Sequence, residues 1–289
     1  MATARKILFS AVKNEAPFLV EWIAYHKAIG FDRIIIASND SDDGTTELLD
    51  ALDAAGEIHH IHHNVTPRQS PQGRAAELAN ASGLITDGDW IIWLDADEFL
   101  NIHAGAGHVA DLIAAMGDAV AMLISWRLFG DAGCNDPGPW RFVSAGFDRA
   151  SQLEIVPISA IKTFYRYDRN RIRLSHKSPH RPRIDRQQPL ADGDVITSGG
   201  CPMGMAHDVG RRWMQGIDSS ANSTISAGEV SWTLAQINHY SVRTKDLFQL
   251  KKLRGRGYRG RKREDSGIRH DDRFFTRHNR NEVEDRSIL

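Results

Sequence analysis

The sequence is poor in several features that would place it in a specialised class of protein. It has two cysteines in 289 residues, Cys134 and Cys201, too few for a disulfide framework, so we expect a reducing cytoplasmic setting. No apolar run reaches the about 18 residues that a membrane-spanning helix needs, and we expect no secretory signal at the N-terminus. The net charge of −1 gives no overall attraction to nucleic acid. We therefore expect a cytoplasmic globular protein, and association with the inner face of the membrane stays open.

The positive charge that is present gathers near the C-terminus. From Arg243 onwards the chain reads RTKDLFQLKKLRGRGYRGRKRED, which is strongly basic and rich in glycine. Such a run is usually a solvated helix followed by a loose tail. The alternative is an arm that binds anions, and the choice depends on what the rest of the chain binds.

The first half of the chain alternates short apolar runs with patterns typical of helices. Strands that alternate with helices predict an α/β fold with a parallel sheet covered on both faces. Asn14 is the expected N-cap of the first helix. The second half is irregular, with short elements within AIKTFYRY and TLAQINHYSV. The expected strands cover residues 6–12, 33–39, 57–63, 89–97 and 118–129.

Three polar clusters each follow one of the expected strands. They read KNE, NDSDDG and DADE, and they begin at Lys13, Asn39 and Asp95. Because the carboxyl ends of parallel strands meet at one edge of a sheet, where ligands bind, we expect the three clusters to lie together. This coincidence favours a binding site over three unrelated solvated loops.

The third cluster has the chemistry of a cation site. Asp95 and Asp97 lie two positions apart at the end of an apolar strand, where both can turn toward one ion. Mg²⁺ and Mn²⁺ prefer oxygen ligands and also bind phosphate oxygens. The alternative is a solvated strand end in which Glu98 caps the next turn.

Taken together, these motifs resemble the family 2 glycosyltransferases, and most closely a bacterial subgroup related to family 92. The resemblance rests on VKNEAPFLVEWIAYHKAIGFDRIIIASNDSDDGTTELL, DWIIWLDADEFL, WRLFGDAG, INHYSVRTKDLFQLKKLRGRG and NRNEVEDRSI. It implies a GT-A fold, which is an α/β/α sandwich with a mainly parallel sheet and an irregular acceptor or lid region. It also implies a metal-dependent, inverting enzyme that uses Mn²⁺ or Mg²⁺ and moves a sugar from a nucleotide sugar, expected to be a UDP-sugar. The expected acceptor is a glycan, a lipid-linked or a small-molecule hydroxyl.

The resemblance also implies a division of the chain and a set of site residues. Residues 1–240 would form the transferase domain, with a nucleotide-sugar part to about residue 130 and an acceptor part over 131–240, and 241–289 would form the basic arm. Asp97 would be the direct metal ligand. The nucleoside pocket would contain Asn14, Glu15, Asn39, Asp40 and Asp43; the metal site Asp95, Asp97 and His239; and the diphosphate site Lys251, Lys252 and Arg254. Arg74 would either flank the donor or lie on a helix surface.

An inverting enzyme also needs a carboxylate base that does not bind the metal, because a cation would make it too weakly basic. Asp131 follows the last expected strand in LFGDAG, so it is our first candidate, with an ordinary loop aspartate as the alternative. Asp208 is the next candidate.

Two other functions compete with the enzyme interpretation. A phosphate- or nucleic-acid-binding module would use the basic arm, with Tyr258, Phe274 and Phe275 stacking on bases. A phosphotransferase would show G-x-x-x-x-G-K-[ST], which the sequence lacks. The expected edge of the sheet is acidic, which favours the transferase, so we expect no nucleic-acid partner.

Overall fold

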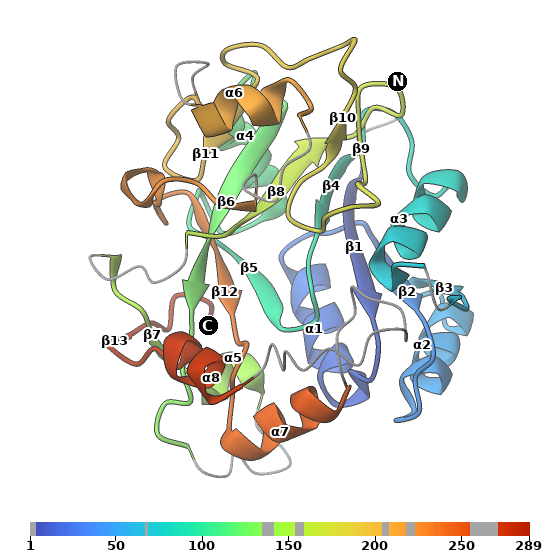
Figure 1. The fold of residues 1–289 in the computed structure, drawn as a ribbon, viewed down its shortest axis with the longest axis vertical. Helices are drawn as coiled ribbons and strands as arrows, with labels where there is room; N and C mark the ends of the chain where they lie inside the picture. The colour runs from blue at the N-terminus through green and yellow to red at the C-terminus, as the bar shows by residue number, and fades with distance from the viewer. Residues whose placement is uncertain are drawn as a thin grey trace.

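A mixed sheet forms the centre of the molecule (Figure 1). The computed structural model describes residues 4–66, 69–134, 142–153, 159–203, 208–217, 223–254 and 271–289. Within these residues the strand order is β3-β2-β1-β4-β8-β6-β12-β5, and β11 also pairs with β6. The strands are β1 (Lys6–Val12), β2 (Arg33–Ser38), β3 (His59–His62), β4 (Trp90–Trp93), β5 (Glu98–Ile102), β6 (Ala121–Leu128), β8 (Ile161–Arg166), β11 (Val195–Thr197) and β12 (Ala235–His239).

The α/β class and the mainly parallel sheet that the sequence predicts are confirmed. The pairs β1–β2, β2–β3, β1–β4, β6–β12 and β6–β11 are parallel. Three pairs are antiparallel, because β8 runs against both β4 and β6, and β5 runs against β12. The expected strand over 89–97 is shorter than predicted, since β4 ends at Trp93 and a turn carries the acidic motif to β5.

Helices cover both faces of this sheet. They are α1 (Ala16–Ala28), α2 (Thr45–Ala54), α3 (Pro71–Ala81) and α4 (Val109–Met116). Alternate residues of β1 face opposite sides, so Leu8 packs in the cluster that contains α1, α2 and α4 residues, whereas Phe9 packs with the alanines of α3. The part of the sheet that contains β1 and β2 is thus covered by helices on both faces.

The start of α1 differs from the prediction in one respect. Glu15, not Asn14, holds the N-cap position, and Asn14 adopts φ 53 instead. Thr45 of α2 supplies the missing cap, because its Oγ1 accepts hydrogen bonds from the backbone N–H groups of Glu15 and Ala16, both at 2.9 Å. The loops after β1 and β2 are therefore held together.

The C-terminal segment is bound to the sheet. Two short helices, α7 (Lys245–Arg254) and α8 (Asp272–His278), lie at the end of the molecule where β1 and β6 finish (Figure 1). The last strand, β13 (Val283–Glu284), pairs with β7 (Arg149–Ala150). Asp285 accepts from Arg127 of β6 at 2.6 Å and from Gln236 of β12 at 2.8 Å.

The remaining elements are small and lie in the irregular second half. They are α5 (Val143–Gly146), α6 (Asp208–Met214), a 3-10 turn at Ala227–Glu229, and the pair β9 (Ile172–Arg173) and β10 (Arg183–Ile184). Among the described helices, none has the length and apolar character to cross a membrane.

His26 of α1 connects this helix to β5 and should make the fold sensitive to acid. Its Nδ1 donates to the Trp22 carbonyl at 2.7 Å and its Nε2 accepts from the Leu100 N–H at 3.3 Å, so the neutral ring satisfies both partners. Burial lowers the pKa of His26 from 6.5 to about 3. Between these values the unfolded chain binds a proton and the folded chain does not, so the free energy of unfolding falls as pH decreases below 6.5, by about 2 kcal/mol at pH 5 from this group alone.

Urea denaturation at pH 7 and pH 5 checks this prediction. His26→Gln keeps one donor and one acceptor but does not titrate, so it should be less stable at pH 7 and lose less stability on acidification. His62→Gln, at an exposed position of β3, should retain the wild-type pH dependence. Equal losses in wild type and His26→Gln would contradict the assignment.

Candidate functional site

The acidic motif occupies the turn between β4 and the first residue of β5. Asp97 and Glu98 are buried, while the side chain of Asp95 is about one-third exposed. Glu98 is the first residue of β5 and lies opposite His239 in the β5–β12 ladder, and its carboxylate also caps the turn that starts at Asp95. Three neighbouring acidic side chains in such a place need compensating positive charge or a proton, and burial raises the pKa of Glu98 to about 8.

Lys162 supplies compensation to two of them. This lysine lies in the middle of β8, is fully buried, and places Nζ 3.1 Å from Asp95 Oδ2 and 2.9 Å from Glu98 Oε2. Burial alone would lower the pKa of Lys162, but the two carboxylates raise it, so the side chain stays charged. The backbone N–H of Asp95 also donates to Glu98 Oε2 at 2.9 Å.

Asp97 receives its compensation from the C-terminal half of the chain. Its Oδ2 contacts the Lys251 ammonium of α7 and lies 3.6 Å from His239 Nε2, and its backbone oxygen accepts from the Tyr240 N–H at 2.8 Å. Burial alone would raise the pKa of Asp97, yet Lys251, His239 and Arg243 hold it well below its usual value. Burial lowers the pKa of His239, which favours a neutral imidazole that can act as a ligand.

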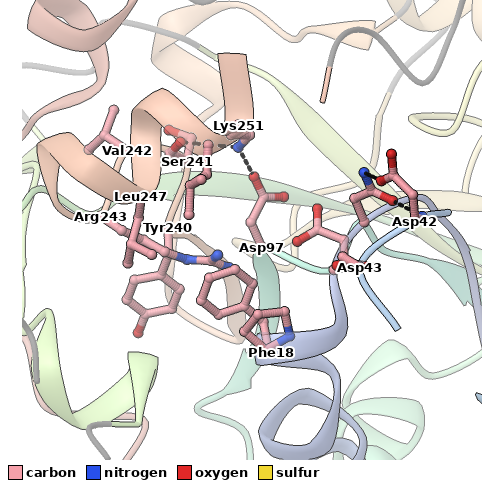
Figure 2. A pocket seen from close by; sticks show the side chains of 14 residues that line it. Phe18, Asp42, Asp43, Asp97, Tyr240, Ser241, Val242, Arg243, Leu247 and Lys251 are labelled. Atoms are coloured by element: carbon pink, nitrogen blue, oxygen red, sulfur yellow. Dashed lines mark hydrogen bonds and ion pairs between the residues drawn. The ribbon is translucent and has the colours of Figure 1, made fainter. Parts of the chain in front are cut away.

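A cavity of about 350 Å³ opens in front of Asp97 (Figure 2). It contains residues from all three strand-end clusters together with the segment that follows β12. The lining residues are Asn14, Glu15, Pro17, Phe18, Asp42, Asp43, Asp97, Tyr240, Ser241, Val242, Arg243, Leu247, Leu250 and Lys251. The structure thus brings the KNE, NDSDDG and DADE clusters to one place.

The loops after β1 and β2 form one wall of this cavity. Asn14 Nδ2 donates to Asp42 Oδ1 at 2.5 Å, and Asn14 Oδ1 accepts from the Asp42 N–H at 3.0 Å. Asp43 accepts from the Thr45 N–H at 3.0 Å and from the Ala16 N–H at 3.2 Å. These bonds orient the carboxylates of Asp42 and Asp43 at the cavity.

The opposite wall comes from residues 240–251, and Arg243 is its most constrained member. It is a non-glycine residue at φ 52, its side chain is buried, and its guanidinium lies 3.6 Å from the centre of the Phe18 ring (Figure 2). Its Nη2 approaches the Ala96 carbonyl at 3.5 Å, while Nε is buried without a hydrogen-bond partner among the described residues. Burial lowers the pKa of Arg243 to about 10, so it remains a cation at neutral pH.

Several predicted site residues lie elsewhere. Asn39 is buried and donates to Asp40 Oδ2 at 3.3 Å, and neither residue lines the cavity. Arg74 is exposed on α3, 3.5 Å from Glu77, which corresponds to the helix-surface alternative. Arg254 and Asp208 belong to α7 and α6, but their side chains lie outside the described part of the structure. Their predicted roles stay predictions.

Asp131, the first candidate for the base, contacts the C-terminal segment. Its carboxylate accepts from Asn279 Nδ2 at 3.0 Å and Asn281 Nδ2 at 3.2 Å, and from the Gly133 N–H at 3.0 Å. It is not among the residues that line the cavity. These bonds connect the loop after β6 to the segment after α8, and the role of Asp131 as the base stays a prediction.

The predicted metal ligands come together only in part. Asp97 and His239 place an oxygen and a nitrogen close enough to share one cation, whereas Asp95 is directed to Lys162. Among the described residues there is no group of three or more candidate side chains around one point. A cation would fit at Asp97 and His239 if Lys251 moved away from Oδ2, with further oxygens supplied by a bound ligand.

Sequence reasoning missed two of the cations that surround the motif, Lys162 and Arg243. Lys162 had a signal, because it is the one charged residue in the stretch AIKTFY. Arg243 had none, because neither its left-handed backbone nor its contact with Phe18 follows from local sequence. The sequence also did not single out Phe18, Tyr240 or Leu247 as residues that line the cavity.

An α/β sheet with carboxylates at the ends of its parallel strands and a cavity beside them defines a ligand-binding α/β protein. Comparison with known families makes this specific: residues 9–136 match the family described as glycosyl transferase family 2. The predicted resemblance to this family is therefore confirmed over residues 9–136.

The curated relatives are named as glycosyltransferases of family 92. A glycosyltransferase family 92 protein of Arabidopsis thaliana is 31% identical over 128 residues, which are 44% of this chain and 22% of that protein. One of Oryza sativa subsp. japonica is 36% identical over 93 residues, covering 31% of this chain and 15% of that protein. The chain thus spans less than a quarter of the length of either relative.

Solved structures show a more distant likeness. TarS 1-349 of S. aureus aligns with 95% of this chain and 70% of its own, at 11% identity and a TM-score of 0.42. Glucosyl-3-phosphoglycerate synthase of Mycobacterium tuberculosis, in complex with Mn²⁺, uridine diphosphate and glucosyl-3-phosphoglycerate, aligns with 41% of this chain and 43% of its own, at 18% identity and a TM-score of 0.28.

Removal of Lys162 should destabilise the fold strongly. Lys162→Met would leave Asp95 and Glu98 without their shared cation, and loss of one partner of a buried ion pair costs about 3–5 kcal/mol. Urea denaturation measures the change. The double variant Lys162→Met, Glu98→Gln removes one of the two carboxylates as well and should recover part of the loss. A single variant as stable as wild type would contradict the assigned compensation.

Proposed function

We propose that the protein transfers a sugar from a nucleotide-sugar donor, a UDP-sugar, to a hydroxyl acceptor, and that the cavity at Asp97 holds the diphosphate part of the donor. The observation that carries this proposal is the cavity itself. In a family 2 domain, it joins the strand-end loops at Asp42 and Asp43 to a wall that contains Arg243 and Lys251.

The shape and chemistry of the two walls support a nucleotide. Carboxylates of the loops after β1 and β2 can accept hydrogen bonds from a base N–H or from ribose hydroxyls. The opposite wall offers a guanidinium and an ammonium, which are the groups that bind phosphate oxygens. Apolar side chains between them exclude water from the reacting sugar, chiefly Phe18, Tyr240 and Leu247.

The charge of the cavity supports the predicted use of a divalent cation. Four carboxylates line it, from Glu15, Asp42, Asp43 and Asp97, against the two cations of Arg243 and Lys251. A diphosphate would therefore enter an acidic cavity, and Mn²⁺ or Mg²⁺ bound at Asp97 and His239 would offset this repulsion. When bound, such an ion stabilises the charge that develops on the departing diphosphate.

The competing interpretation as a nucleic-acid-binding module has less support. The ring of Phe274 stacks on His278 at 3.6 Å and on Phe248 at 6.0 Å, so it is already engaged within the C-terminal segment. Tyr258 lies outside the described residues. Lys251 contacts Asp97 in the cavity and is largely buried, so it is not part of an exposed basic surface.

Asp97→Asn should abolish metal-dependent donor binding while the fold is retained. The variant removes the negative charge that a divalent cation needs, and it also relieves the acidic cluster of one charge. Calorimetry with UDP, in the presence and absence of Mn²⁺, measures the effect; a decrease of at least about 100-fold in affinity with Mn²⁺ corresponds to roughly 2.7 kcal/mol.

Asp95→Asn is the comparison that separates the two aspartates of the motif. Because its carboxylate contacts Lys162, this variant should lower the free energy of unfolding and retain most of the Mn²⁺-dependent UDP affinity. UDP affinity in Asp97→Asn equal to that of wild type would show that the cavity does not use Asp97 in this way. A screen of nucleotide sugars for Mn²⁺-dependent hydrolysis then identifies the donor.

A further inference from the structure

Lys251 forms a buried ion pair with Asp97 at the position where a divalent cation is expected. Lys251 Nζ contacts Asp97 Oδ2 and also donates to the Ser241 carbonyl at 3.0 Å, and both side chains are at least four-fifths buried. The same oxygen, Oδ2, is the one that faces His239 Nε2 at 3.6 Å. The ammonium therefore occupies the side of the carboxylate that a divalent cation would share with His239.

A lysine ammonium and a divalent cation cannot both occupy this position. They carry like charges, and the buried surroundings offer little solvent to screen their repulsion. Either cation satisfies Asp97, whereas a carboxylate left alone at a buried position is costly. The two states of the site are thus Asp97 with Lys251 and Asp97 with a divalent ion.

We propose that Lys251 is a built-in counter-cation of Asp97, which a divalent cation displaces, and that the released ammonium then binds diphosphate oxygens together with Arg243. The displacement of Lys251 by a divalent cation does not depend on the proposed function, whereas the binding of the released ammonium to a diphosphate rests on it. In the free protein the lysine prevents the acidic cluster from destabilising the fold.

The two cations of this wall differ in their freedom to move. Arg243 is held by its stacking on Phe18 and by its buried position, and its Nε keeps an unused donor that an anion can take. Lys251 is a single ammonium on a flexible four-carbon chain, held at its end by Asp97 and one carbonyl. Lys251 can therefore be displaced while Arg243 stays in place, and both then face the same cavity (Figure 2).

Mn²⁺ binding in the absence of nucleotide tests the exchange. Lys251→Met removes the competing cation, so Mn²⁺ affinity, measured by calorimetry or by the electron paramagnetic resonance signal of free Mn²⁺, should increase roughly tenfold or more. The same variant should bind UDP more weakly than wild type at saturating Mn²⁺. Opposite changes in the two affinities would not arise from general damage to the site.

Lys252→Met is the matched control. Lys252 follows Lys251 on α7, but its ammonium lies 3.2 Å from the exposed Asp272 and does not contact Asp97. This variant should keep the wild-type Mn²⁺ affinity. Lys251→Gln, which can still donate to the Ser241 carbonyl, provides a second test of the same prediction if Lys251→Met folds poorly.

The thermal unfolding midpoint gives an independent readout. Without metal, both Lys251 variants leave Asp97 without its ion-pair partner, so Mn²⁺ should raise their midpoints more than that of wild type. Unchanged or weaker Mn²⁺ affinity in both Lys251 variants, or no Mn²⁺ binding by any form of the protein, would overturn the exchange. Tighter Mn²⁺ binding without any UDP binding would support the exchange at Asp97 and would instead count against the proposed function.

Discussion

The constraint on which this structure depends is the need to neutralise three neighbouring carboxylates beside the core. Asp95, Asp97 and Glu98 lie within four residues at the end of β4. The compensating lysines come from distant parts of the chain, Lys162 from the central strand β8 and Lys251 from α7. Charge compensation therefore ties the irregular second half and the C-terminal segment to the sheet at the point where the site forms, and the stability of the fold and the chemistry of the site rest on the same contacts.

The alternating first half of the fold could be predicted from local sequence, because buried parallel strands are apolar runs and their helices have clear ends. In the second half only short elements could be predicted, within AIKTFYRY and TLAQINHYSV, where β8 and β12 lie. The buried positions of Lys162 in β8 and of Glu98 at the start of β5 do not follow from local sequence. The antiparallel pairing of β8 between β4 and β6 depends on this long-range ion pair and on packing, and neither leaves a periodic signal in the sequence.

The candidate site, like the fold, could be predicted only in part from the sequence. The meeting of the Asn14, Asp42–Asp43 and Asp97 positions follows from parallel topology, since strands that run together end together. The direction of each carboxylate does not follow from it. Asp95 and Asp97 are two residues apart within the turn between β4 and β5, yet one points to Lys162 and the other to Lys251 and His239. Asp131 likewise follows β6 as expected, but the amides of Asn279 and Asn281, about 150 positions further on, determine its contacts.

One segment, residues 240–251, carries both the apolar and the cationic side chains of the cavity wall. Its start is fixed by the Tyr240 N–H bond to Asp97 and by the buried Arg243, whereas Leu250 lies largely exposed at the far end and Lys251 is held there by the ion pair with Asp97. A change in the charge at Asp97 therefore acts on the end of the wall that can move. The carboxylate that would attract a metal is also the one that contacts Lys251, so the proposed exchange couples occupation of the cavity to the position of the Lys251 side chain at Asp97 Oδ2.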